Sequence, residues 1–185
     1  MKFAPNLILV GPMGSGKTSL GKRLAQRLGM IFVDADREIE RSTGANIPLI
    51  FELEGEAGFR LREHEVLQQL CAGAGRVIAT GGGAVLHPDT GPLLSRRGFV
   101  VYLQVDARTQ LERLRHDRSR PLLQREDRAE ALQRLSQERE PLYQCVADLR
   151  HDTSHGSLKH GVEQLVAALD LHWRRTDTGT LDPPA

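Results

Sequence analysis

The stretch Leu7-Ile8-Leu9-Val10-Gly11-Pro12-Met13-Gly14-Ser15-Gly16-Lys17-Thr18 decides the fold of this 185-residue chain. Residues 11–18 match G-x-x-x-x-G-K-[ST], the phosphate-binding P-loop. The apolar run at 7–10 is typical of a buried strand, and Leu20, Leu24 and Leu28 predict an amphipathic helix after the loop. A strand, a glycine loop and a helix in this order favour a P-loop over the alternative, a plain glycine-rich turn.

The residue types in the loop suit a nucleoside triphosphate. Glycines allow a tight turn that brings backbone N–H groups close to phosphate oxygens, and the helix N-terminus adds partial positive charge. Lys17 can reach the β- and γ-phosphates, and the hydroxyl of Thr18 can bind Mg²⁺. The nucleotide-binding residues predicted from the loop are Gly14, Ser15, Gly16, Lys17, Thr18 and Ser19.

The composition excludes several classes of function. The chain has 25 basic and 24 acidic residues and a net charge of +1, so no basic stripe indicates nucleic-acid binding. No apolar run approaches the ~20 residues that cross a bilayer, and residues 1–5 do not resemble a signal peptide. Cys71 and Cys145 form no metal or redox motif. We therefore expect a reduced, cytoplasmic monomer without nucleic-acid or membrane partners.

Apolar runs alternate with amphipathic segments along the chain. Strands are predicted at Leu7–Val10, Met30–Val33, Arg76–Ala79, Phe99–Leu103 and Ala147–Leu149. Helices are predicted at 17–28, 57–71, 107–115, 127–145 and 158–172. The alternation predicts a three-layer α/β fold, in which a five-stranded parallel sheet has helices on both faces. We expect one domain over residues 1–175 and a frayed tail at 176–185.

Two carboxylates and three glycines follow predicted strands. Asp34 and Asp36 come directly after the second strand, where a metal and a substrate hydroxyl could bind; the alternative is an N-cap for the next helix. Gly81, Gly82 and Gly83 follow the third strand, and three consecutive glycines favour close approach of a ligand over a plain turn.

Charged residues elsewhere leave alternatives open. Arg60 and Glu63 can share one helix face, where an ordinary surface ion pair is the alternative to a functional role. Arg120 and Arg139 lie close to prolines and could bind phosphate or carboxylate groups, although composition alone does not single them out. The seven histidines show no metal-ligand spacing, so we expect no zinc site.

Taken in series, the motifs resemble those of shikimate kinases. Beside the P-loop they are Val33-Asp34-Ala35-Asp36, Phe59-Arg60-Leu61-Arg62-Glu63, Thr80-Gly81-Gly82-Gly83, Arg120-Pro121-Leu122-Leu123 and Arg139-Glu140-Pro141-Leu142-Tyr143. The likeness runs from about residue 5 to about residue 170, in the family's order and with close to its spacing. A P-loop alone is common to many unrelated NTPases. It is the series of motifs, taken in order, that is specific to one family.

The resemblance implies a nucleoside-monophosphate-kinase-like fold with strand order 2-3-1-4-5 in the sheet. It implies transfer of the γ-phosphate of ATP to the 3-hydroxyl of shikimate, giving shikimate 3-phosphate and ADP, in aromatic amino acid biosynthesis. The substrate-binding region would span about 34–63, and the charged segment 116–128 would be a lid over ATP.

The resemblance also implies individual roles. Arg60 and Arg139 would bind the carboxylate of shikimate, Asp36 would contact its hydroxyls and act catalytically, and Gly81–Gly83 would approach it closely. Lys17 and Arg120 would be catalytic at the transferring phosphate, and Arg113 would lie against adenine. Thr18 and Asp34 would hold Mg²⁺. The loop Ser154-His155-Gly156-Ser157 departs from the arginine and proline that some members carry near adenine.

Two other functions are compatible with a P-loop. Another small-molecule kinase of the same fold, such as a gluconate kinase, would share the loop but should lack the two substrate arginines together with the three glycines. A non-catalytic nucleotide-sensing protein usually loses the P-loop lysine or the substrate arginines, and here all of them are present.

Overall fold

A five-stranded parallel sheet forms the centre of the computed structural model, which describes residues 1–115 and 128–176. Its strands are β2 (Asn6–Val10), β3 (Ile31–Asp34), β4 (Arg76–Ala79), β5 (Gly98–Gln104) and β6 (Leu149–Asp152). Their spatial order is β3-β4-β2-β5-β6, and all neighbours are parallel. Counted within this sheet alone, the order is 2-3-1-4-5, so the predicted topology is confirmed.

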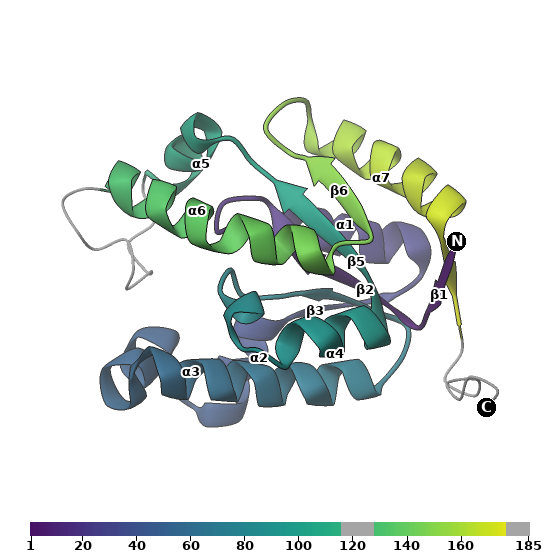
Figure 1. Cartoon of the computed structure of the whole chain (residues 1–185). Helices are drawn as coiled ribbons and strands as arrows, with labels where there is room; N and C mark the ends of the chain where they lie inside the picture. Colours follow the sequence, from purple (N-terminus) through teal and green to yellow (C-terminus); the bar gives the residue numbers. More distant parts are fainter. Residues whose placement is uncertain (116–127, 177–185) are drawn as a thin grey trace.

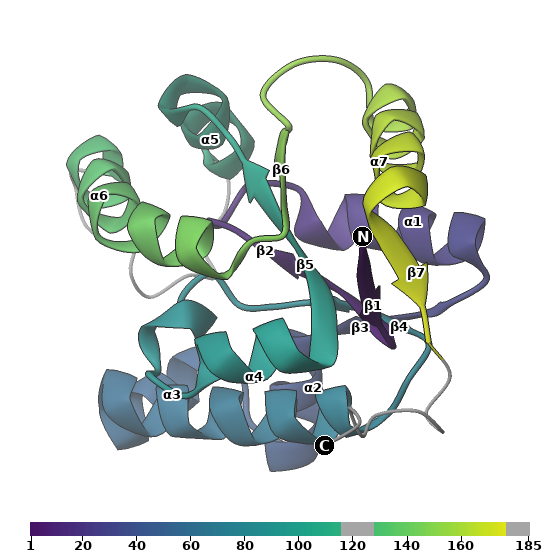
Figure 2. The ribbon, with the colours of Figure 1, turned by 45° about the vertical axis from the view of Figure 1, so that its right-hand side comes forward.

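Helices cover both faces of the sheet (Figures 1 and 2). They are α1 (Lys17–Leu28), α2 (Ala35–Thr43), α3 (Ile47–Ala72), α4 (Thr90–Arg97), α5 (Ala107–Leu114), α6 (Arg128–Val146) and α7 (Leu158–His172), with a 3₁₀ turn η1 at Ala84–Leu86. Among the described residues, no helix is both long and apolar enough to cross a membrane.

Alternating side chains of the central strands explain the layers. In β2, Ile8 and Val10 join a core cluster with α2, α3, α4 and α6, whereas Leu7 and Leu9 join a second cluster with α1 and α7. All five residues of β2 are buried. A strand with both faces covered needs a continuous apolar run, which is what residues 7–10 provide.

Local sequence sets where the helices begin. Asp34 caps α2, Asn46 caps α3 and Asp106 caps α5, each through its side chain. Within α3, Gly55 has φ 68° and ψ −176°, so the helix is kinked there. The kink separates the partly exposed start of α3, where Ile50 is buried, from the segment 56–72, which carries the buried Arg60, Glu63 and His64.

The observed elements differ from the predicted ones at several places. Helices α2 and α4 were not predicted, α3 begins at Ile47 rather than at residue 57, and β6 lies at 149–152 rather than at 147–149. Helix α2 has only two apolar residues, Ala35 and Ile39, and α4 contains Gly91 and Pro92, which are typical of turns. The polar strand β6 is half exposed at the edge of the sheet.

A second, two-stranded parallel sheet joins the two ends of the described chain. β1 (Lys2–Ala4) pairs with β7 (Trp173–Arg175), and Trp173 Nε1 donates a hydrogen bond of 3.0 Å to the carbonyl of Ala4. Thr176, the first residue of the predicted tail, donates its backbone N–H to Ala4 at 3.3 Å. Residues 177–185, the rest of that predicted tail, lie outside the described residues.

Candidate functional site

A pocket of about 730 Å³ lies beyond the carboxyl ends of β2, β3 and β4. Parallel strands end at the same edge of the sheet, so their following loops converge there. The lining includes most of the predicted site residues: Gly14, Gly16, Lys17, Thr18, Ser19, Asp34, Asp36, Arg60, Gly81, Gly82, Gly83, Arg113 and Arg139. The structure therefore brings together side chains that are more than 100 positions apart in the sequence.

The P-loop has the backbone that its glycines predict. Gly14 and Gly16 have φ of 78° and 86°, in the left-handed region that favours glycine. Lys17 Nζ lies 2.7 Å from the carbonyl oxygen of Gly11 and 2.8 Å from that of Pro12. The ammonium group is thus buried against the loop, at the N-terminus of α1, where an anion would be favoured.

Thr18 and Asp34 meet at the base of the pocket. Thr18 Oγ1 donates a hydrogen bond of 2.8 Å to Asp34 Oδ2, while Asp34 Oδ1 accepts from the backbone N–H of Arg37 at 3.5 Å. Asp34 therefore caps α2 and also faces the P-loop. Of the two aspartates, Asp34 is the N-cap of the helix, and Asp36 lies within its first turn. A hydroxyl and a carboxylate are hard oxygen ligands, and this donor set fits Mg²⁺.

A buried network of charges forms the opposite wall. Arg60 Nη1 lies 2.6 Å from Glu63 Oε2, and Arg60 Nη2 lies 3.0 Å from Glu56 Oε1. Arg60 and Glu63 are 8% and 1% exposed, so the alternative of a surface ion pair is wrong. The guanidinium also lies 5.2 Å from the centre of the Phe59 ring. Arg139, 4% exposed on α6, approaches Glu56 Oε1 at 4.0 Å.

Three atoms of this wall are buried without a hydrogen-bond partner among the described residues: Arg60 Nε, Glu63 Oε1 and Arg139 Nε. Burial raises the pKa of Glu63 to about 7, against the lowering effect of Arg60. Burial acts to lower the pKa of Arg60, but Glu63 and Glu56 raise it above its usual value. Unsatisfied buried polar atoms are costly, so a ligand is expected to pair with them. The two Nε–H donors of Arg60 and Arg139 favour an anionic group, and Glu63 Oε1, an acceptor, favours a hydroxyl donor.

The three glycines make room for this network. A Cβ on Gly83 would overlap the guanidinium of Arg60, and one on Gly81 would overlap Glu63 Oε1 and lie 2.7 Å from Asp36 Oδ1. The carbonyl oxygen of Gly82 accepts a hydrogen bond from the hydroxyl of Tyr143. The glycines therefore allow side chains, as well as a ligand, to approach the backbone.

A second hollow of about 240 Å³ adjoins the P-loop on the side of α7. Arg113 lines both cavities, and its guanidinium donates to the carbonyl oxygens of Gly14 at 3.0 Å and Thr153 at 2.6 Å. The loop Ser154-His155-Gly156-Ser157 partly encloses this hollow, because His155, Gly156 and Ser157 line it.

Some predicted site residues lie outside the part of the chain that the structure describes, and some residues of the observed site were not predicted. Arg120 and the lid segment 116–127 are outside the described residues, whereas Arg128, the last predicted lid residue, begins α6. Glu56 and Tyr143 were not predicted as site residues. Tyr143 belonged to a recognised motif, which was a usable signal, but Glu56 is one of many acidic residues in the chain and carried none.

Comparison with known proteins points to one family. The shikimate kinase family model matches residues 13–170. A shikimate kinase of Stenotrophomonas maltophilia (strain R551-3) is 52% identical over 177 residues, which cover 96% of this chain and 98% of the relative. One of Xanthomonas axonopodis pv. citri (strain 306) is 51% identical over 174 residues, covering 94% of this chain and 97% of the relative.

Solved structures agree with the sequence comparison. A shikimate kinase from Acinetobacter baumannii in complex with shikimate matches with a TM-score of 0.88 and 45% identity, covering 91% of this chain and 94% of that one. A gluconokinase from Sinorhizobium meliloti 1021 matches with a TM-score of 0.56 and 16% identity, covering 92% of this chain and 94% of that one. At that identity the gluconokinase shares the fold alone.

Proposed function

Because this chain belongs to the shikimate kinase family, we propose that the two halves of its pocket bind the two substrates of one phosphoryl transfer. The enzyme is an ATP-dependent phosphotransferase of aromatic amino acid biosynthesis, and it transfers the γ-phosphate of ATP to the 3-hydroxyl of shikimate. One observation supports the division of the site: the P-loop and the Arg60–Arg139 wall line the same cavity of about 730 Å³.

The P-loop half binds ATP in this proposal. Backbone N–H groups of Gly14–Ser19 surround the phosphates, and Lys17 Nζ, already at the loop, places positive charge beside the transferring group. The adjoining hollow of about 240 Å³ takes the base, with Arg113 between the two cavities. The resemblance implies that Arg120, which lies outside the described residues, would act on the phosphates, and that segment 116–128 would be a lid.

Thr18 and Asp34 would hold Mg²⁺ in this half, because their hydroxyl and carboxylate oxygens lie 2.8 Å apart beside the P-loop lysine. The ion, when bound, neutralises charge on the β- and γ-phosphate oxygens. The protein's own contribution is to fix Asp34, whose second oxygen is held by the start of α2.

The wall opposite binds shikimate. Its carboxylate would lie against Arg60 and Arg139, whose Nε atoms are buried and have no other partner among the described residues. Asp36 lines the pocket beside Gly81 and would orient the attacking hydroxyl and accept its proton. The chemistry is mainly positioning and electrostatic stabilisation.

A coupled assay of ADP release tests this function. We expect ADP to form rapidly with ATP, Mg²⁺ and shikimate, and only slowly when shikimate is omitted or replaced by gluconate. Equal rates with and without shikimate would contradict the proposal, and faster release with gluconate would favour the related sugar-acid kinase.

Gly83→Ala should weaken shikimate binding selectively. The added methyl group forces the guanidinium of Arg60 away from its place between Glu63 and Glu56. A hydrogen bond to a charged group is worth about 1.5–3 kcal/mol, so we expect the KM for shikimate to rise about 10- to 100-fold and the KM for ATP to change little.

The matched control is Gly91→Ala, outside the pocket, where the new methyl meets one methyl group of Val146 at 3.0 Å. Steady-state kinetics with each substrate varied in turn gives both KM values. An unchanged KM for shikimate in Gly83→Ala would show that Arg60 need not occupy its observed position.

The proposal also covers the domain organisation, oligomeric state and location of the protein. Residues 1–175 would form one kinase domain with its shikimate-binding region at about 34–63, acting as a monomer in the cytoplasm. The free thiols of Cys71, which is buried, and Cys145, which is exposed, are compatible with a reducing compartment.

A further inference from the structure

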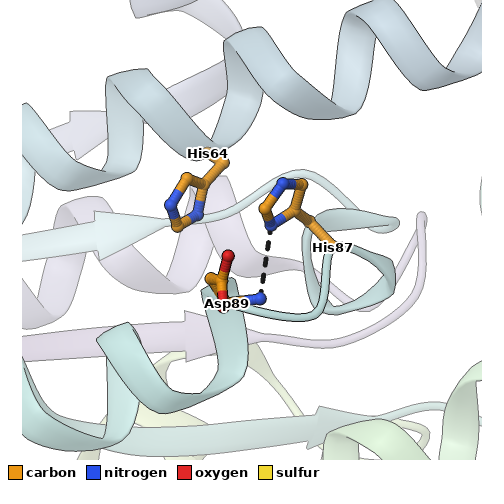
Figure 3. A group of neighbouring side chains, drawn as sticks. All are labelled: His64, His87 and Asp89. Carbon is orange, nitrogen blue, oxygen red and sulfur yellow. Dashed lines mark hydrogen bonds between the residues drawn. The ribbon is translucent and has the colours of Figure 1, made fainter.

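A group of metal-ligating side chains lies outside the substrate pocket, where α3, the segment after η1 and the start of α4 meet (Figure 3). His64 is buried on α3, His87 is half-buried after η1, and Asp89 is exposed just before α4. The two imidazole rings are stacked, with centroids 4.3 Å apart and planes at 13°. The Asp89 carboxylate points toward the space between the rings (Figure 3).

The side chain of Asp89 is not used to cap α4. Asp89 stands at the N-cap position of α4 but makes no capping hydrogen bond with its side chain. Pro92, at the third helical position, has no N–H for such a bond. The carboxylate of Asp89 is available to the imidazoles. The backbone N–H of Asp89 donates a hydrogen bond to His87 Nδ1 at 3.3 Å.

His64 is held in place by its surroundings. Its Nδ1 lies 2.9 Å from Oγ1 of the buried Thr90, which fixes the ring against the start of α4. A neutral, oriented imidazole is the form that binds metal ions.

We propose that His64, His87 and Asp89 form a binding site for a divalent transition-metal ion, with Zn²⁺ as the best match. Two imidazoles and one carboxylate are a donor set that Zn²⁺ takes, with further positions left for water. One ligand atom from each residue lies within 4.8 Å of the others. Bonds of about 2.0–2.2 Å in a tetrahedral site require ligand atoms roughly 3.4 Å apart, so shifts of up to about 1.4 Å close the site.

Such a shift is available because two of the three ligands are not tightly packed. Asp89 is exposed and His87 is half-buried, so both can rotate toward the fixed His64. The ion would link α3 to the segment that follows the three glycines, and its expected effect is on stability. The sequence gives no zinc motif because His87 and Asp89 are only two residues apart but His64 lies on α3, well before them, and the fold brings the three together.

Titration of the metal-free, tag-free enzyme with Zn²⁺ by isothermal calorimetry tests the site, with Co²⁺ as a visible spectroscopic probe. We expect one ion per chain, and affinity weakened about tenfold or more in His87→Gln and in Asp89→Asn. Zinc at about 100 times its dissociation constant should raise the Tm of the wild type by about 5 °C and that of the variants by less.

His155→Gln is the matched control, because it removes an imidazole away from the cluster and should leave zinc affinity unchanged. Circular dichroism without zinc establishes whether each variant folds. If His87→Gln does not fold, the zinc affinity of Asp89→Asn, an exposed isosteric change, tests the site alone. The proposal is overturned if the wild type binds no zinc, if Asp89→Asn binds it as tightly as the wild type, or if His155→Gln abolishes binding.

Discussion

Replacing Lys17 with alanine is expected to lower kcat about 10²- to 10³-fold or more, while the protein remains folded. The ammonium group lies at the P-loop, 2.7 Å from the carbonyl oxygen of Gly11 and 2.8 Å from that of Pro12. Phosphoryl transfer develops charge on the transferring group, and one preorganised electrostatic contact of this kind is worth about that factor. The measurement is kcat for ADP formation at saturating ATP and shikimate.

Lys22→Ala is the control for this change, because Lys22 is an exposed residue of the same helix α1. It should keep the activity of the wild type. Thermal unfolding of Lys17→Ala should resemble that of the wild type, because the core around β2 is untouched. A folded Lys17→Ala variant with near-normal kcat would show that Lys17 has no catalytic role.

Arg139→Ala is expected to raise the KM for shikimate about 100-fold and to leave the KM for ATP within about twofold. Arg139 is 4% exposed, lines the pocket, and has a buried Nε without a partner among the described residues. Removing a guanidinium that binds a carboxylate leaves that anion unpaired in a desolvated site. Steady-state kinetics and direct binding of shikimate, measured by calorimetry, give the effect.

Arg134→Ala provides the control on the same helix, because Arg134 is exposed on α6. Arg139→Lys should recover only part of the affinity, since an ammonium group lacks the planar fork of the guanidinium. Shikimate affinity equal to that of the wild type in Arg139→Ala would place the carboxylate elsewhere in the pocket.

Much of the fold could be predicted from the sequence because its signals are strong. The P-loop with its flanking strand and helix, and the apolar runs at 76–79 and 99–103, correspond to β2, α1, β4 and β5. The strand order came from the resemblance to shikimate kinases and is confirmed. Weak signals gave the errors. The polar strand β6 was predicted two residues too early, and α2 and α4 were missed because α2 has only two apolar residues and α4 contains Gly91 and Pro92.

The sequence predicted which residues belong to the candidate site, but it did not predict how their side chains are arranged. Arg60 and Glu63 look like any helical ion pair in the sequence. Only the fold shows that both are buried and that Arg60 also pairs with Glu56. The space needed by Arg60 explains Gly83 better than a turn does. Burial of polar groups depends on contacts between distant segments, which a pattern in one sequence does not contain.

The most direct test of the two-substrate pocket follows the γ-phosphate itself. ATP labelled at the γ-phosphate is incubated with Mg²⁺, shikimate and the enzyme, and the products are separated and identified by NMR. Our account predicts that the label appears on the 3-oxygen of shikimate, in a one-to-one ratio with ADP. Label recovered as inorganic phosphate, or shikimate left unmodified while ADP accumulates, would contradict it.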